Sequence, residues 1–205
     1  MDWGSIIGSI LGSVSTILVA WFGYNQYTKN KETDAKIERI KEEDKIKGRR
    51  RNDNSAKIYG ELWTCLHALH ADRAYIVQPH PLGDNDYITI YFEVKEKGIE
   101  PMKPNIQKRR MSDVASFAAI LERNSFRVIN DIDSDVEDSY AKYLFCAGGT
   151  KRAIIGRLSD NKYDWVGSII IEFCHNQIIE EEEARHVMSC AATNIQYILP
   201  EIEEI

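Results

Sequence analysis

Two apolar runs near the C-terminal end, Arg152-Ala-Ile-Ile-Gly-Arg-Leu158 and Trp165-Val-Gly-Ser-Ile-Ile-Ile-Glu-Phe173, decide the fold. Both runs are short and rich in isoleucine, which is typical of β-strands. The polar stretch Ser159-Asp-Asn-Lys162 between them predicts a tight turn. The two runs therefore predict an antiparallel hairpin, and the rest of the chain supplies the elements around it.

The same signals predict further strands and helices on both sides of this hairpin in the sequence, which together make an α+β domain. Three further strands are expected: residues 73–78, 87–94 and 126–130. Four helices are expected: residues 55–71, 105–124, 135–146 and 179–197. The first helix carries one apolar face, made of Ile58, Leu62, Leu66 and Leu69. The order of elements predicts an antiparallel sheet flanked by helices.

Three stretches of this domain resemble the GAF family. Ala71-Asp-Arg-Ala-Tyr-Ile-Val77 is similar to the passage from the first helix into the first strand. The stretch from Gly149 to Leu158 resembles the family pattern G-x-R-S-x-x-x-x-P-L, with Ala153 in the usual Ser position and Arg157 in the usual Pro position. The run from Trp165 to Ile171 is similar to x-x-G-x-L-x-L of the last strand. The resemblance covers roughly residues 55–198, and a PAS-like or profilin-like sheet is the alternative.

The resemblance implies a sensory or dimerisation module. GAF domains often bind a small molecule between the sheet and the cross-connections, and they commonly pair through their first and last helices. The chain lacks the Asn-Lys…Phe…Asp-Glu pattern of the cyclic-nucleotide type and an evident bilin-attachment cysteine, so no cofactor is expected. The candidate ligand-binding residues are Tyr91, Phe117, Tyr140 and Arg152.

The N-terminal segment predicts a transmembrane anchor over residues 1–27. Residues 3–24 contain no charged side chain, and a helix of that length spans roughly 30 Å, the thickness of the hydrocarbon layer. Aromatic rings that favour the headgroup level lie at both ends, as Trp3 at one end and Trp21 and Tyr24 at the other. A cleaved signal peptide is the less favoured alternative, because no Lys or Arg precedes the apolar run.

Small residues recur along this predicted anchor with a spacing of four. They are Gly4, Gly8, Gly12, Thr16 and Ala20. Such a face lets two helix backbones approach closely in lipid. We therefore expect the anchor to associate with copies of itself, with a dimer favoured.

The charge distribution predicts the orientation of the anchor. Residues 28–54, read as a charged helical linker, carry ten basic and seven acidic side chains, whereas residues 55–205 carry a net charge of −8. The basic side chains, including Arg49, Arg50 and Arg51, follow the predicted span, so the positive-inside rule places the C-terminal domain in the cytoplasm and the N-terminus outside the inner membrane. Membrane lipid is the expected partner of these cations. The acidic domain is not expected to bind nucleic acid.

The cysteines and histidines form no recognisable catalytic or metal-binding motif. His67 and His70 have a spacing that could bind metal on a helix, and Cys174, His175, His186 and Cys190 could form a thiol site if the last strand and helix approach. Packing roles explain both sets more simply. The acidic cluster of Asp131, Asp133, Asp135 and Asp138 lacks the Gly and terminal Glu of an EF-hand loop. No Walker loop, GxSxG or HExxH occurs, so we expect no catalytic residue, no metal site and no enzyme.

Two functions remain open from the sequence. The first is a membrane-anchored, non-enzymatic sensory or regulatory module that acts through self-association or a partner, with an unknown small molecule as a further ligand. The second is an oligomerising membrane effector of holin-like type, from phage or anti-phage defence, gated by its soluble domain. A scaffold whose pocket is filled by its own side chains is a third option.

Overall fold

The computed structural model describes residues 36–42, 53–80, 86–160 and 164–199, together with the single positions Trp21, Gln26, Lys29 and Lys31. The chain divides into two compact units, Met1–Arg51 and Asn52–Ile205. In the first unit, residues 36–42 are helical and exposed. The predicted anchor, apart from Trp21 and Gln26, lies outside the described residues, and so do Arg49, Arg50 and Arg51. Over the part of the chain that is described, no helix is both long and apolar enough to cross a membrane.

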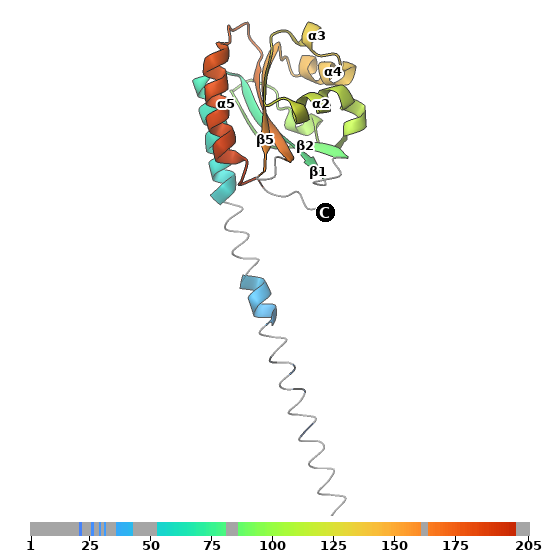
Figure 1. The fold of residues 1–205 in the computed structure, drawn as a ribbon, viewed down its shortest axis with the longest axis vertical. Helices are drawn as coiled ribbons and strands as arrows, with labels where there is room; N and C mark the ends of the chain where they lie inside the picture. The colour runs from blue at the N-terminus through green and yellow to red at the C-terminus, as the bar shows by residue number, and fades with distance from the viewer. Residues whose placement is uncertain are drawn as a thin grey trace, which may run out of the picture. The chain divides into compact units, whose positions relative to one another are not determined.

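The second unit is built on one antiparallel sheet of six strands in the order β3-β2-β1-β6-β5-β4 (Figure 1). The strands are β1 (Arg73–His80), β2 (Tyr87–Lys95), β3 (Arg109–Arg110), β4 (Phe126–Ile129), β5 (Arg152–Ser159) and β6 (Trp165–Phe173). The five predicted strands are confirmed, and the predicted hairpin of β5 and β6 pairs as expected. β1 and β2 pair as a second hairpin. Because β1 lies beside β6, the two hairpins form one continuous sheet.

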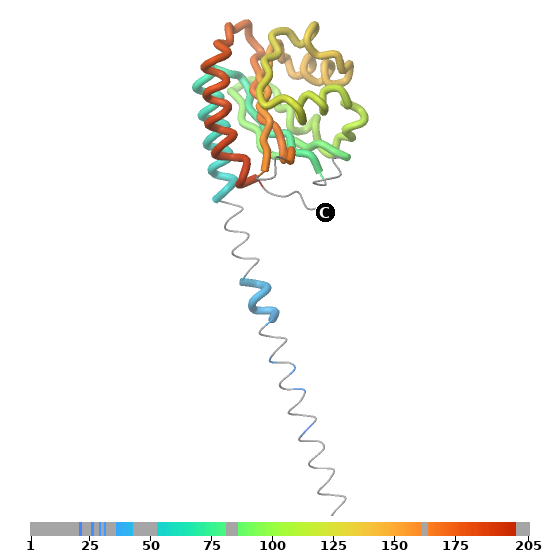
Figure 2. Tube along the Cα trace, in the orientation of Figure 1, coloured from blue at the N-terminus to red at the C-terminus, as the bar shows by residue number. Residues whose placement is uncertain are grey.

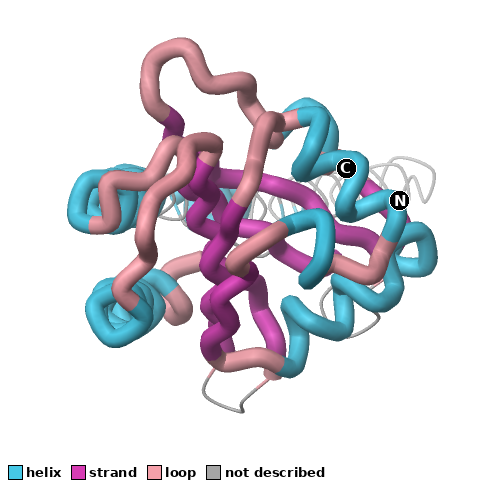
Figure 3. The backbone as a smooth tube through the Cα atoms, turned by 90° about the horizontal axis from the view of Figure 1, so that it is seen from above, coloured by secondary structure: helices cyan, strands magenta, loops and turns pink. Residues whose placement is uncertain are grey.

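The helices divide between the two faces of this sheet. A helix over residues 53–68 and α5 (Glu181–Ile195) lie side by side on one face (Figures 1 and 2). The cross-connections on the other face contain α2 (Ala115–Arg123), α3 (Ile132–Asp135), α4 (Ser139–Ala147) and the 3-10 turns η1 (Lys103–Asn105) and η2 (Met111–Val114). Figure 3, which looks along the first helix and α5, shows the strands between the two groups of helices.

Two apolar cores follow from this arrangement, one on each face of the sheet. The first core joins the apolar face of the first helix, Ala184, Met188 and Ala191 of α5, and alternate strand residues such as Ile154 and Ile171. All four predicted core residues of the first helix belong to it. The second core joins the opposite strand residues, such as Val77 and Ile155, to the cross-connections. The expected α+β fold, with an antiparallel sheet flanked by helices, is confirmed.

Two predicted helices were wrong in their boundaries. The helix expected over residues 105–124 begins only at Ala115, because Arg109 and Arg110 pair with Ile88 and Tyr87 to form the sixth strand. Lys108, with φ of 47°, turns the chain into that strand. The helix expected over residues 135–146 is two short helices.

An aspartate begins each of these two short helices. Asp131 accepts a hydrogen bond from the Asp133 backbone, and Asp138 accepts from the backbones of Tyr140 and Ala141. Val136, between the two helices, is extended and buried.

Candidate functional site

The most concentrated set of buried polar side chains lies where β1 and β6 pair. Arg73 of β1 lies directly opposite Glu172 of β6, and the side chains of both are completely buried. The Arg73 Nε atom donates to Glu172 Oε2 at 3.0 Å, and Nη2 donates to the same oxygen. The other carboxylate oxygen of Glu172 accepts from the Tyr75 hydroxyl. Both oxygens of this buried carboxylate are therefore hydrogen-bonded.

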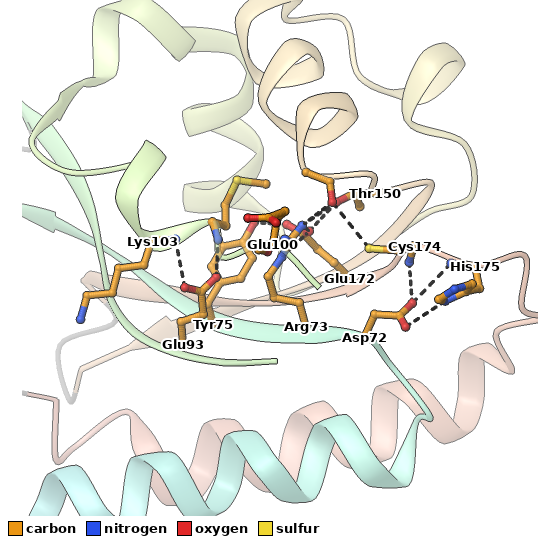
Figure 4. Close-up of polar contacts among 12 residues, drawn as sticks. Asp72, Arg73, Tyr75, Glu93, Glu100, Lys103, Thr150, Glu172, Cys174 and His175 are labelled. Carbon is orange, nitrogen blue, oxygen red and sulfur yellow. Dashed lines mark hydrogen bonds and ion pairs between the residues drawn. The ribbon is translucent and has the colours of Figure 1, made fainter. Parts of the chain in front are cut away.

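The remaining donors of Arg73 tie the sheet to two connections. Its Nη1 atom donates to the Glu100 carbonyl in the loop after β2, and its Nη2 atom donates to Thr150 Oγ1 at 2.9 Å and to the Gly148 carbonyl at 3.4 Å. Thr150 in turn donates to Glu172. A Cβ atom at Gly148 would lie 2.7 Å from Arg73 Nη2, so only glycine leaves room for the guanidinium. Figure 4 shows how these side chains converge.

The electrostatics of this cluster favour a charged Arg73 and a neutral Tyr75. Burial alone would lower the pKa of Arg73, but the adjacent Glu172 carboxylate more than offsets burial, so the pKa is raised. Burial raises the pKa of Tyr75 well above its usual value, and the nearby Glu172 raises it further. The phenol therefore remains a hydrogen-bond donor to Glu172 at all physiological pH values.

A second polar group connects the cluster to the surface. Asp72 accepts from the backbone of Cys174 at 2.6 Å and of His175 at 3.3 Å, and its Oδ1 atom lies 3.0 Å from Nδ1 of the exposed His175 imidazole. The Cys174 thiol donates to the same Gly148 carbonyl that Arg73 contacts, at 3.7 Å. Burial raises the pKa of this thiol to about 11. The ends of β1 and β6 are thus held together beside the cluster.

A small cavity lies between the sheet and the cross-connections, next to Tyr75. Its volume is about 20 Å³, which is room on the order of one water molecule. The lining is apolar apart from Arg109 and the Tyr75 hydroxyl, and Phe117 and Phe145 pack edge to face at 5.2 Å. The lining residues are Tyr75, Val77, Ile88, Met102, Ile106, Arg109, Val114, Phe117, Leu121, Ala141, Leu144 and Phe145. The protein's own side chains therefore fill most of this space.

The four candidate ligand-binding residues lie in different surroundings. Phe117 lines the cavity. Tyr140 packs against the same core, with the Arg109 guanidinium 4.8 Å from its ring centre. Tyr91 is exposed because a β-bulge leaves it without a partner on β1. Arg152 donates to the Gln177 carbonyl. Of the four, only Phe117 lines the cavity; Tyr140 packs against the cavity-lining Arg109, and Tyr91 and Arg152 lie elsewhere.

The candidate histidine and cysteine sites do not assemble into a metal centre within the described ranges. His67 stacks on Trp63 with ring centres 5.3 Å apart, and His70 lies at the end of the first helix with φ of 51°. Cys190 and His186 are neighbours on the exposed face of α5, with Cys190 Sγ 3.9 Å from His186 Nε2. Cys174 and His175 instead contact Asp72.

Sequence reasoning missed Arg73, Glu172 and Thr150, which form the cluster. A signal for two of them is present. Glu172 interrupts the apolar run Ile169-Ile170-Ile171 before Phe173, and Arg73 opens a strand that is otherwise apolar in its first half. A charge at such a position is buried only with a partner.

Comparison with solved structures shows the fold family. The cyanobacteriochrome receptor PixJ matches with a TM-score of 0.59 at 12% identity, over 73% of this chain and 97% of that one. A phycocyanobilin-bound GAF domain from a cyanobacterial phytochrome matches with a TM-score of 0.54 at 17% identity, over 75% of this chain and 88% of that one. A domain of a putative two-component sensor histidine kinase from Sinorhizobium meliloti matches with a TM-score of 0.51 at 11% identity, over 67% of this chain and 85% of that one. No protein-family model and no curated protein matches the sequence. The domain therefore has a GAF fold.

Proposed function

We propose that this protein is a membrane-anchored, non-enzymatic sensory or regulatory module that acts through self-association of its first helix. Its GAF fold is shared with domains of photoreceptors and of a sensor histidine kinase, and its residues 3–24 form an uncharged run of membrane-spanning length.

The observation that carries the proposal is the outward face of the first helix. Tyr59 and Trp63 are exposed by 37% and 39% although both are large aromatic residues. Between them, Gly60 has open space where a side chain would be. A glycine inside an exposed helix costs about 1 kcal/mol relative to alanine, and exposed aromatic groups mark interaction surfaces. A glycine between two aromatic residues suits the close approach of a second helix.

The same helix is well placed to transmit a change from the sheet. Only four residues separate its last described helical turn, which ends at residue 68, from Arg73. Arg73 in turn holds the carbonyls of Glu100 and Gly148 in the two connections beyond the sheet. A ligand or partner that displaces those connections acts on the end of the first helix through the Arg73 cluster.

The first test is the mass of the full chain in detergent, measured by light scattering after size-exclusion chromatography. We expect a dimer. The substitution Trp63→Glu introduces a charge into the proposed interface and shifts the equilibrium toward monomer. Tyr143→Glu is the matched control, because Tyr143 is also an exposed aromatic residue (65%) but lies on α4. A wild-type monomer, or equal behaviour of both variants, contradicts the proposal, and a large assembly favours the membrane-effector alternative.

The second test concerns the anchor. After expression, the full chain is expected in the membrane pellet after an alkaline carbonate wash, whereas a chain lacking residues 1–27 is expected in the supernatant. A full chain released by carbonate contradicts membrane spanning. Addition of a protease to spheroplasts then reports whether the C-terminal domain is protected, as the cytoplasmic orientation requires.

A further inference from the structure

A groove runs along the side of α5 over the β4 edge of the sheet. Its volume is about 340 Å³. The floor is apolar and includes Phe126, Gly156 and Met188. The rim carries the polar side chains of α5, among them Arg185, Ser189 and Thr193. The groove is thus a surface with an apolar floor and a hydrogen-bonding rim.

The positive charge of this groove is unusual in an acidic domain. Its lining contains Arg157 and Arg185 and no acidic side chain, whereas residues 55–205 carry a net charge of −8. The Arg185 guanidinium lies 4.3 Å from the Phe126 ring centre and so extends across the groove toward β4. It also pairs with Glu181 at 2.9 Å, but both side chains are more than half exposed, and such pairs contribute about 0–1 kcal/mol. Arg185 therefore stays available to a second carboxylate.

The segment that follows α5 has the complementary composition. Residues 200–205 read Pro-Glu-Ile-Glu-Glu-Ile, with three carboxylates and two isoleucines. The isoleucines match the apolar floor of the groove, and the glutamates match Arg185 on its rim.

The lengths also agree. Gln196 lies at one end of the groove, where its Oε1 atom accepts from the Ser159 backbone at 3.4 Å. Arg185 lies eleven residues earlier on α5, or about 16 Å away at 1.5 Å per residue. Six extended residues span about 20 Å. A segment that turns back after Leu199 can therefore lie beside α5 from Gln196 to Arg185.

We propose that residues 200–205 of the same chain dock into this groove, with the isoleucines on the Phe126 and Met188 floor and the glutamates facing Arg185. This contact is independent of the first-helix interface.

Hydrogen exchange of the full chain in detergent micelles tests the proposal. The amides of residues 201–205 are expected to exchange on the order of tenfold more slowly than those of a synthetic peptide of the same sequence, because docking against the groove shields this backbone from water. Exchange at the rate of the free peptide overturns the proposal.

Two variants change the groove in different ways. Arg185→Glu reverses its charge, and Thr193→Trp fills it without changing charge. Both are expected to remove the protection of residues 201–205 while the amides of β5 and α5 keep theirs, which shows that the domain is still folded. Lys97→Glu is the matched control, because it reverses an exposed charge in the loop after β2.

A charge exchange separates docking from a general loss of order. Replacing Glu201, Glu203 and Glu204 by Lys removes protection, and combining this change with Arg185→Glu restores part of it. Protection that survives both groove variants places the segment elsewhere and overturns the proposal. Protection that disappears on dilution assigns the groove to the segment of a second copy, which also overturns it.

Discussion

The Arg73 guanidinium and the Glu172 carboxylate form an ion pair across the β1–β6 junction with both side chains completely buried. This junction is the place where the two hairpins of the sheet join. The pair also holds one connection through Glu100 and another through Thr150 and Gly148. One side-chain cluster thus fixes the sheet to the layer that covers its second face.

Breaking this pair on one side is expected to destabilise the domain strongly. Glu172→Gln removes the charge but keeps the shape, and it leaves the Arg73 guanidinium buried without its counter-charge. Loss of one partner of a buried pair costs about 3–5 kcal/mol. The free energy of unfolding, measured by urea denaturation with circular dichroism, reports the loss.

The matched control removes both charges. The double substitution Arg73→Met with Glu172→Met leaves no unpaired buried charge, so it is expected to recover at least half of the stability lost in Glu172→Gln. A double variant as unstable as the single one, or more so, shows instead that the hydrogen bonds to Tyr75, Thr150 and the two carbonyls matter more than the charge pairing.

The buried thiols predict a loss of stability at alkaline pH. Burial raises the pKa of Cys65 to about 12, whereas an unfolded thiol titrates near about 8.5. The folded state therefore binds the proton more tightly. The stabilisation is fully present below about pH 8.5 and is lost as the pH rises toward 12. Urea unfolding between pH 7 and 10 measures how steeply the free energy of unfolding falls with pH. We expect this fall to be less steep in Cys65→Ala.

Thiol labelling gives an independent check on the same assignment. Cys146 and Cys190 are exposed, whereas Cys65 is buried and the pKa of Cys174 is raised to about 11. At pH 8, the two exposed thiols are expected to react quickly with a disulfide reagent, Cys174 slowly because its raised pKa leaves little thiolate, and Cys65 only after unfolding. Rapid reaction of all four in the folded protein contradicts the burial of Cys65.

The periodicity of the sequence predicted the sheet well because its strands are bounded by turn residues. Trp165–Phe173 matches its predicted limits, and the first helix buries its four predicted residues. The sixth strand was missed because Arg109 and Arg110 have no apolar alternation. They pair with β2 only once the chain has turned at Lys108, a tertiary effect.

The candidate site was predicted less well than the fold. Phe117 is at the cavity as expected for a residue on the inner face of its helix. Tyr91 is not, because a bulge at Ile76 and Val77 shifts the pairing of β2. A one-residue shift moves a side chain to the other face of a sheet, and no local pattern reveals it.

A substitution at Gly60 tests the first-helix interface, because it is expected to raise the stability of the domain and to weaken the dimer. Gly60→Ala has space for its methyl group and raises helix propensity, so it is expected to stabilise the isolated domain by about 1 kcal/mol. The same methyl group would separate two helices that pack at this residue. The thermal midpoint should rise while the dimer dissociates at a higher protein concentration. A rise in the midpoint with unchanged association places the interface elsewhere.

The predicted anchor is expected to self-associate through its small face, just as the first helix is expected to pair through its outward face. Replacing Gly8 and Gly12 by Ile fills that small face with branched side chains while keeping the segment apolar, so insertion into the membrane is expected to be unaffected. Energy transfer between fluorescent fusions of residues 1–27 in membranes measures their self-association. This signal should fall severalfold in the variant. Replacing Ile10 and Leu11 by Val and Ile is the matched control, because it changes two apolar residues outside the every-fourth series. Equal energy transfer in all three proteins would mean that the segment anchors the domain without pairing, and self-association would then depend on the first helix alone.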